Sequence, residues 1–185
     1  MRAVKTIYLG GVPASGKTTV FRAVRDALFP RATAFRHGLC RGVASGPFRM
    51  VGVFDGSTFE GTDRLSNCVI DDALDYVAEL ERDGRRRVVF AEGDRLFCER
   101  FLRATRAEAY VVEAYARVLA ARRAARAASG DGQTAHFLKS KRTKVDNLRR
   151  RRGIRTLWNN TPEDRDRIVN LLVSRARLWT EQTIT

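Results

Sequence analysis

Residues 11–18 read GVPASGKT and match the pattern G-x-x-x-x-G-K-[ST] without a gap. The glycines of such a loop let backbone N–H groups turn inward around a phosphate, and a helix that follows points its positive end at the same group. Lys17 would reach the β- and γ-phosphates of a nucleotide, and the Thr18 hydroxyl would ligate Mg²⁺. We therefore expect a nucleotide to be held here by its phosphates.

The flanks of this loop support the same interpretation. Residues 4–10 (VKTIYLG) are β-branched and aromatic, as in a buried strand, and residues 17–28 carry apolar side chains at helical spacing. A chance glycine-rich turn would need neither flank, so a phosphate cradle is the better explanation. The residues expected to contact the nucleotide are Gly11, Val12, Pro13, Ala14, Ser15, Gly16, Lys17, Thr18 and Thr19.

Carboxylates that could serve phosphoryl transfer follow three later segments. They are Asp55, then Glu60 and Asp63, then Glu92 and Asp94. A phosphoryl acceptor needs a carboxylate to orient its hydroxyl and take its proton, and Asp63 and Asp55 are the alternatives for this base. Asp63 also opens a predicted helix, where it would be only an N-cap. Glu92 and Asp94 end a hydrophobic run, so we expect one of them at the metal and Asp94 also near the reacting phosphate.

Arginines are the candidate partners of the transferring phosphoryl group. Arg64 and Arg95 each follow an aspartate and would hold the acceptor or a phosphate, although as surface ion pairs they would contribute little. Arg122 and Arg126 are one helical turn apart, so they share a face. We expect these two to act in catalysis when the segment that carries them closes over the nucleotide. Some cations of this segment should meet ATP and others the acceptor, and the sequence does not sort them.

Asn160 and Thr161 follow the last predicted strand, where phosphotransferases with such a phosphate loop commonly pass the adenine ring. We expect both residues near the adenine, although a turn and a helix cap explain them equally well.

The chemistry requires elements that bring these residues to one edge of a sheet. Strands alternate with helices along the 185 residues, which predicts a parallel sheet covered on both faces. The fold class expected is α/β, a P-loop three-layer sandwich with a parallel five-stranded sheet, resembling nucleotide kinases, in one domain (1–185). The five strands are expected at 4–10, 48–54, 85–94, 109–112 and 154–158, with 32–36 a candidate for a further strand. Helices are expected at 17–28, 63–82, 95–104, 115–128 and 162–179. Residues 38–47 are expected to form an irregular loop.

The net charge of +14 points to a polyanionic partner. Residues 117–155 hold 13 Lys or Arg and two acidic residues, so most of the excess lies in one segment. A solvated basic face is the ordinary explanation of a charge run, but this concentration favours contact with phosphates. We expect residues 117–153 to form a basic lid, of which 130–153, poor in large apolar residues, is mobile rather than part of the core.

Other classes of protein fit the sequence less well. No apolar run approaches the roughly 20 residues that span a bilayer, and no cleaved signal peptide is expected. Three cysteines without a CxxC pair favour reduced thiols in a cytosolic compartment. The guanine-reading N-K-x-D motif of GTPases does not occur, and motor or AAA-type ATPases need a longer chain. A kinase with its own lid fits the size.

Four segments, GGVPASGKTT, FEGTDRLS, FAEGDRLF and SKRTKVDNL, resemble in this order the bacteriophage P-loop kinases that phosphorylate 5-hydroxymethyluracil in DNA. The resemblance spans about residues 5–170; its first motif is generic, and EGTDRLS with EGDRLF is more particular. It implies transfer from ATP, with Mg²⁺, to the hydroxymethyl group of a base within the polymer. This step would be an intermediate in thymine hypermodification, in the cytoplasm of the infected bacterium.

Three other functions remain open from the sequence. They are a small-molecule or nucleotide kinase, a polynucleotide 5′-hydroxyl kinase, and a nucleic-acid-binding protein that uses ATP as a switch. The basic lid favours a polymeric acceptor over a free nucleotide. A base in duplex DNA would need to leave the stack for in-line transfer, and Phe35, Phe48, Phe54 and Phe59 are candidates to stack on it, although core packing is expected for most of them.

Overall fold

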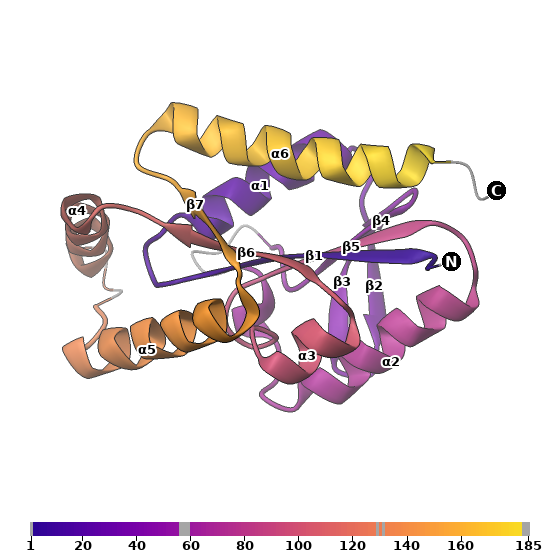
Figure 1. Cartoon of the computed structure of the whole chain (residues 1–185), viewed down its shortest axis with the longest axis horizontal. Helices are drawn as coiled ribbons and strands as arrows, with labels where there is room; N and C mark the ends of the chain where they lie inside the picture. The colour runs from indigo at the N-terminus through magenta and orange to yellow at the C-terminus, as the bar shows by residue number, and fades with distance from the viewer. Residues whose placement is uncertain (1, 56–59, 129, 131, 183–185) are drawn as a thin grey trace.

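A computed structural model of the chain describes residues 2–55, 60–128, 130 and 132–182 (Figure 1). A central sheet separates two layers of helices, and its strands follow the order β2-β3-β4-β5-β1-β6-β7. The strands are β1 (Val4–Gly11), β2 (Thr33–His37), β3 (Cys40–Ser45), β4 (Phe48–Val51), β5 (Arg87–Glu92), β6 (Glu108–Glu113) and β7 (Arg155–Trp158). The helices are α1 (Lys17–Leu28), α2 (Val69–Arg82), α3 (Glu99–Ala104), α4 (Ala116–Ala128), α5 (Ala135–Arg152) and α6 (Pro162–Glu181), with a 3₁₀ turn at Thr62–Arg64.

The chain has the α/β three-layer architecture that the sequence predicted (Figure 1), with one difference in the sheet. The described residues form seven strands instead of five. Strands β4, β5, β1, β6 and β7 run parallel to one another, and β3 and β2 extend the β4 edge by antiparallel pairing. The parallel part places the carboxyl ends of these five strands at one edge, where open α/β sheets bind their ligands.

The prediction of an irregular loop at 38–47 is wrong, because β3 occupies most of it. Gly38 and Gly46 have φ angles of 57° and 52°, which let the chain reverse tightly on either side of this strand. Gly42 lies opposite Val51 in the β3–β4 ladder, and a Cβ there would stand 2.0 Å from the Met50 carbonyl oxygen. The glycines that suggested a loop therefore serve a compact antiparallel extension.

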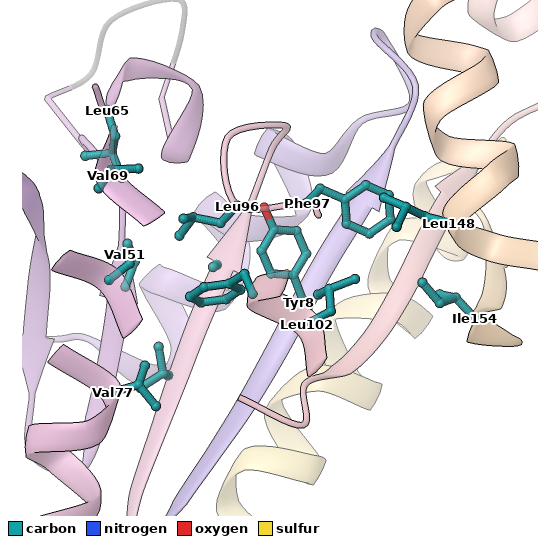
Figure 2. Packing of buried hydrophobic residues seen from close by; sticks show 14 of the residues in the cluster. Tyr8, Val51, Leu65, Val69, Val77, Leu96, Phe97, Leu102, Leu148 and Ile154 are labelled. Carbon is teal, nitrogen blue, oxygen red and sulfur yellow. The ribbon is translucent and has the colours of Figure 1, made fainter. Parts of the chain in front are cut away.

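Apolar side chains fill both sides of the sheet. On one side α1 and α6 cover the sheet and bury Val20, Phe21, Val24 and Leu172 with strand residues of β1 and β5. On the other side α2, α3 and α5 enclose a second cluster that includes Tyr8 and Phe97 (Figure 2). Full burial of such a side chain stabilises the fold by about 1.5–3 kcal/mol, so the two layers hold the sheet edge in place.

The helix predicted at 63–82 begins six residues later than expected. Residues 62–64 form a 3₁₀ turn, Leu65 is extended with φ −79° and ψ 162°, and α2 starts at Val69 after Cys68. Asp63 is therefore not the N-cap of α2. Its carboxylate instead accepts a hydrogen bond from the Asp94 backbone N–H at 2.5 Å.

The segment predicted to be mobile and outside the core is mostly a regular helix, α5. The Thr134 hydroxyl accepts a hydrogen bond from the Phe137 N–H at 3.2 Å at its start, and Gly153 ends it with φ 60°. Val145 and Leu148 are buried in the same cluster as Tyr8 and Phe97, with Ile154 just beyond the helix (Figure 2). Val145 and Leu148, two apolar residues among many cations, anchor the C-terminal half of α5 against the sheet.

The last helix agrees with its sequence signals. Pro162 lies in its first turn, and Thr161 and Asp164 form a reciprocal capping box. None of the helices in the ranges described above is both long and apolar enough to cross a membrane.

Candidate active site

The loop between β1 and α1 has the geometry of a phosphate cradle. Gly11 and Gly16 have φ angles of 145° and 91°, a region that residues with a Cβ rarely occupy. A Cβ would also collide at both positions, 2.4 Å from the Val112 carbonyl oxygen at Gly11 and 2.3 Å from Asn159 Nδ2 at Gly16. Both glycines of the motif are thus required by the backbone and by close neighbours.

Lys17 and Thr18 start α1 beside a buried carboxylate. Lys17 Nζ donates to the carbonyl oxygens of Gly11 and Val12, each at 3.1 Å, so its ammonium lies over the loop. Thr18 Oγ1 donates to Glu92 Oε1 at 3.4 Å. A hydroxyl and a carboxylate side by side are hard oxygen ligands of the kind Mg²⁺ uses together with nucleotide phosphates and water. The residues present therefore fit a magnesium–nucleotide complex.

A cavity of about 690 Å³ opens over this loop and gathers most of the predicted site residues. Its walls include Gly11, Pro13, Ala14, Gly16, Lys17, Thr18, Thr19, Asp63, Glu92, Asp94, Arg95, Arg122, Arg126, Asn160 and Thr161. Val12 and Ser15 lie beneath the wall with their side chains buried. The Ser15 hydroxyl has no hydrogen-bond partner within the described part of the chain.

Asp55 and Arg64 are the two predicted catalytic residues that do not belong to this wall, as the described residues define it. Their side chains form an ion pair with each other instead. Asp55 has about half of its side chain exposed, and Arg64 more than a third. Of the two alternative bases, Asp63 is therefore the one that faces the cavity.

The two acidic motifs, EGTD at 60–63 and EGDR at 92–95, pack against each other through their glycines. A Cβ on Gly61 would stand 2.0 Å from Glu92 Oε1, and a Cβ on Gly93 would stand 2.8 Å from Asp63 Oδ1. Thr62 Oγ1 donates to the Glu92 carbonyl oxygen at 2.5 Å. Each glycine thus leaves room for the carboxylate of the other motif, and Glu92 and Asp63 are held side by side at the cavity.

Replacing Gly61 by alanine should destabilise the protein by about 2–4 kcal/mol, because the new Cβ meets Glu92 and the φ of 92° is unfavourable for alanine. Gly132→Ala is the matched control, since its Cβ would meet nothing within 4 Å; a change within about 0.5 kcal/mol is expected there. Urea denaturation of both variants measures the difference. Equal stability of the two variants would contradict the close packing of Gly61 on Glu92.

Glu92 is the most deeply buried acid of the cavity, only 1% exposed. Burial raises the pKa of its carboxyl to about 7, against the opposing effect of the Lys17 ammonium. In the unfolded chain the ordinary value is 4.5. Between pH 4.5 and 7 the folded protein therefore retains a proton that the unfolded chain has released.

The stability of the nucleotide-free protein should consequently fall as pH rises through this window. The free energy of unfolding is expected to drop by up to about 3 kcal/mol from this group, since each unit of pKa shift corresponds to about 1.4 kcal/mol. Glu92→Gln should remove this part of the pH dependence. Urea unfolding of both proteins at several pH values between 4.5 and 7.5 tests it, and parallel curves would mean that Glu92 is ionised in the folded protein.

Asp94 is tied to the lid helix. Its carboxylate forms ion pairs with Lys141 and with Lys144 Nζ, the latter at 2.9 Å, and its carbonyl oxygen accepts a second hydrogen bond from Lys144 at 2.9 Å. Burial acts to raise the pKa of Asp94, but the hydrogen bonds from the two lysines outweigh it and lower the pKa. Asp94 is thus an ionised anchor for α5 and a poor proton acceptor.

Helix α4 and the loop after β7 support the cradle from outside. An Arg122 guanidinium nitrogen donates to the Ser15 carbonyl oxygen at 3.2 Å, and Asn159 Nδ2 donates to the same oxygen at 2.9 Å. Arg126, one turn after Arg122, lies in the same wall, as their spacing predicted. Asn160 accepts a hydrogen bond from the Tyr115 N–H at 2.7 Å.

Several residues of the site were not identified from the sequence. Lys141 and Lys144 lie within the quoted SKRTKVDNL segment, and their i,i+3 spacing on a helix was the signal that could have found them. Glu60, by contrast, was among the carboxylates noted in the sequence; it lines the cavity, and its buried carboxylate is 2.8 Å from Arg22 Nε of α1. Asn159, which directly precedes the two residues expected near the adenine, instead donates a hydrogen bond to the cradle.

Those of the proposed base-stacking phenylalanines that the structure describes make other contacts within the protein. Phe35 stacks on Tyr76 at 4.6 Å between ring centroids, Phe48 packs in the core beside Phe29, and Phe54 lies under the Arg25 guanidinium. Phe59 lies outside the described residues. The cavity wall instead contains Phe137 of α5, which is 39% exposed.

The sequence and the fold are similar to those of known kinases. A model of the family described as P-loop nucleotide kinase3 matches residues 2–158. Among solved structures, a shikimate kinase from Acinetobacter baumannii in complex with shikimate is similar with a TM-score of 0.48 and 18% identity, over 94% of this chain and 96% of that one. An unliganded sugar kinase from Janibacter sp. HTCC2649 is similar with a TM-score of 0.44 and 14% identity, over 95% and 94%. A search of curated proteins finds no match.

Proposed function

Since the chain belongs to the P-loop nucleotide kinase3 family, we propose that it transfers the γ-phosphoryl group of ATP to the hydroxymethyl group of 5-hydroxymethyluracil in DNA. The observation that carries this proposal is the composition of one cavity, which joins the phosphate loop to Asp63 and Asp94 and has the basic helices α4 and α5 as a further wall. These helices hold 12 Lys or Arg residues and one Asp. Such a charge suits a polymeric anion better than a single nucleotide.

In the proposed reaction the loop holds ATP by its β- and γ-phosphates. Backbone N–H groups of residues 11–18 and the N-terminus of α1 surround the phosphates, and Lys17 leaves its two carbonyl partners to pair with them. Arg122 and Arg126 stabilise the charge that develops on the transferring group. Asn160 and Thr161 line the part of the cavity proposed for the adenine ring.

Asp63 acts as the base. It accepts the proton of the acceptor hydroxyl while the hydroxyl oxygen bonds to the γ-phosphorus and the bond to the β–γ bridging oxygen breaks, releasing ADP. The Asp94 N–H, which donates to Asp63 Oδ1, fixes the orientation of this carboxylate. Thr18 and Glu92 would hold Mg²⁺, with Asp94 the other candidate acid. When bound, the ion neutralises phosphate charge.

Opening of the ion pairs between Asp94 and α5 would admit the acceptor. Lys141 and Lys144 reach Asp94 from α5, and Arg95 lies beside it in the cavity wall. Phe137, on the same helix, offers a ring for the acceptor base. A nucleotide monomer is the second candidate acceptor, because the family description names nucleotide kinases.

Labelled ATP tests the acceptor directly. We expect label on DNA that contains 5-hydroxymethyluracil, and little on thymine DNA, the free nucleoside or its monophosphate. Digestion of the product to nucleosides should place the phosphate on the base, whereas label on a 5′ end would indicate a polynucleotide kinase. Preference for the monomer would exclude the polymer, and DNA-stimulated release of inorganic phosphate without labelled DNA would indicate an ATP-driven switch.

Binding of this DNA should depend steeply on salt. If about four phosphates of a single strand are neutralised, the logarithm of the binding constant should fall with the logarithm of salt concentration with a slope of about −3. Fluorescence anisotropy of a labelled oligonucleotide between 50 and 200 mM KCl measures this slope. A slope near zero would show that the cations of α4 and α5 do not contact the DNA backbone.

A further inference from the structure

A second hollow lies on the other side of the helices that close the nucleotide cavity. It has a volume of about 490 Å³ and is lined by Glu113, Ala114, Tyr115, Ala116, Leu119, Arg123, Leu138, Lys139, Arg142 and Trp158; we call it the aromatic groove. On α4, Arg122 and Arg126 face the nucleotide cavity, whereas Leu119 and Arg123 face the groove. The two hollows therefore share the helices that carry most of the basic charge.

Two exposed aromatic rings stand at the rim of this groove. Tyr115 is 53% exposed and Trp158 is 50% exposed, and their ring centroids are 5.4 Å apart with 39° between the planes. Large aromatic side chains usually bury most of their surface, so two neighbouring rings in solvent indicate a surface prepared for contact. None of the reactions described above uses them.

The backbone under both rings is fixed. Trp158 is the last residue of β7 and pairs with Glu113 in the parallel ladder with β6. The Tyr115 N–H donates to Asn160 Oδ1 at 2.7 Å, and its carbonyl oxygen accepts from Val118 and Leu119 at the start of α4. A backbone held in this way has little conformational entropy to lose when a ligand stacks on the rings.

Cations surround the rings in excess over acids. Arg123, Lys139 and Arg142 line the groove with one carboxylate, Glu113, which Arg142 already pairs at 2.6 Å. Arg123 Nε is buried and has no hydrogen-bond partner among the described residues. Burial, followed by the nearby Arg142 charge, lowers the pKa of Arg123.

We propose that the aromatic groove binds a single-stranded segment of the DNA substrate next to the target base, with bases stacked on Trp158 and Tyr115 and the backbone paired with Arg123 and Lys139. Aromatic faces next to cations are the usual features of single-strand binding surfaces, because every base has a flat face and every linkage a phosphate. An apolar protein segment would match the rings but leave the excess cations without partners. The inference deepens the proposed function and rests on its polymeric acceptor.

Tryptophan fluorescence gives a test that does not depend on catalysis. The chain contains two tryptophans, Trp158 and Trp179. Trp179→Phe keeps an aromatic ring against Arg86, gives up one hydrogen bond of 3.4 Å to the Ala3 carbonyl oxygen, and leaves Trp158 as the one reporter. Titration of this variant with unmodified single-stranded oligonucleotides of 4–16 residues should quench its emission, whereas heparin, a polyanion without bases, should not.

Two further variants, made in the wild-type chain, measure the contribution of the rings. Trp158→Ala should weaken single-strand binding by roughly 5- to 150-fold, the range found when a base-stacking ring is removed. Leu178→Ala is the matched control, because Leu178 is 55% exposed on α6 and lies outside the groove. It should leave binding unchanged. Circular dichroism establishes that both variants are folded.

The outcomes separate this inference from the proposed function. Quenching by DNA together with selective loss in Trp158→Ala supports the groove, even if no label is transferred to 5-hydroxymethyluracil. That pattern would place the error in the proposed function. Unchanged emission, equal quenching by heparin, or equal binding by Trp158→Ala and Leu178→Ala overturns the groove, whether or not the DNA is phosphorylated.

Discussion

Lys17→Ala should lower phosphoryl transfer by roughly 10²- to 10³-fold or more, while DNA binding remains nearly intact. Removing one group that is placed to stabilise transition-state charge has effects of this size, and the lysine of a phosphate loop also contributes to binding the ground state. Among the residues that the structure describes, the hydrogen bonds of the Lys17 ammonium go to two backbone carbonyl oxygens of the loop, so its loss should affect the fold little.

Separate assays test the two parts of this prediction. Transfer is measured with labelled ATP, and DNA affinity with an oligonucleotide by anisotropy at fixed salt. Lys139→Ala is the matched lysine variant with the opposite expectation, since Lys139 lies in the aromatic groove. It should weaken DNA binding and, with DNA at saturation, leave transfer nearly unchanged. Equal loss of DNA affinity in Lys17→Ala would mean that ATP and DNA sites are not divided as proposed.

Asp63→Asn should reduce the rate constant of transfer by about 10²- to 10⁴-fold, the usual contribution of a general base. The asparagine oxygen can still accept the Asp94 N–H, so the packing of the two acidic motifs should survive. ATP affinity should change little, because the base acts on the acceptor hydroxyl. Single-turnover rates at saturating ATP and DNA separate this effect from binding.

Asp55→Asn is the control for this variant, since sequence alone left the two aspartates as alternatives. Asp55 is paired with Arg64 and lies outside the cavity wall, as far as the structure describes that wall. The expected change in rate is less than about threefold, as for the loss of an exposed ion pair. A large loss in Asp55→Asn with near-normal activity in Asp63→Asn would reverse the assignment of the base.

Asp94→Asn separates the base from the lid anchor. Asp94 is ionised and bonded to Lys141 and Lys144, so its substitution should loosen α5 before it affects proton transfer. The acidic motif at 92–95 therefore combines two tasks that the sequence could not distinguish. Glu92 faces Thr18 and the proposed metal position, and Asp94 faces the lid.

Local sequence determined the parts of this protein whose conformation depends on neighbours in the chain. The cradle at 11–18 follows from consecutive residues, because its glycines allow the positive φ angles and Lys17 and Thr18 begin the next helix. Helix α1 has the predicted bounds, and α6 starts where Pro162 and the Thr161 cap predicted it. Strong periodicity and capping act within a few residues, so they can be read without knowledge of the fold.

Tertiary structure decided which distant residues meet. Gly61 and Gly93 allow two motifs 32 residues apart to pack, which selects Asp63 over Asp55 as the acid of the cavity. The cations of α5 suggested a mobile lid, but two apolar residues anchor the helix and bring Lys141 to Asp94. Tyr115 and Trp158 become neighbours only because β6 and β7 pair in the sheet. Contacts of this kind depend on strand order and packing between layers, for which a single sequence has no local signal.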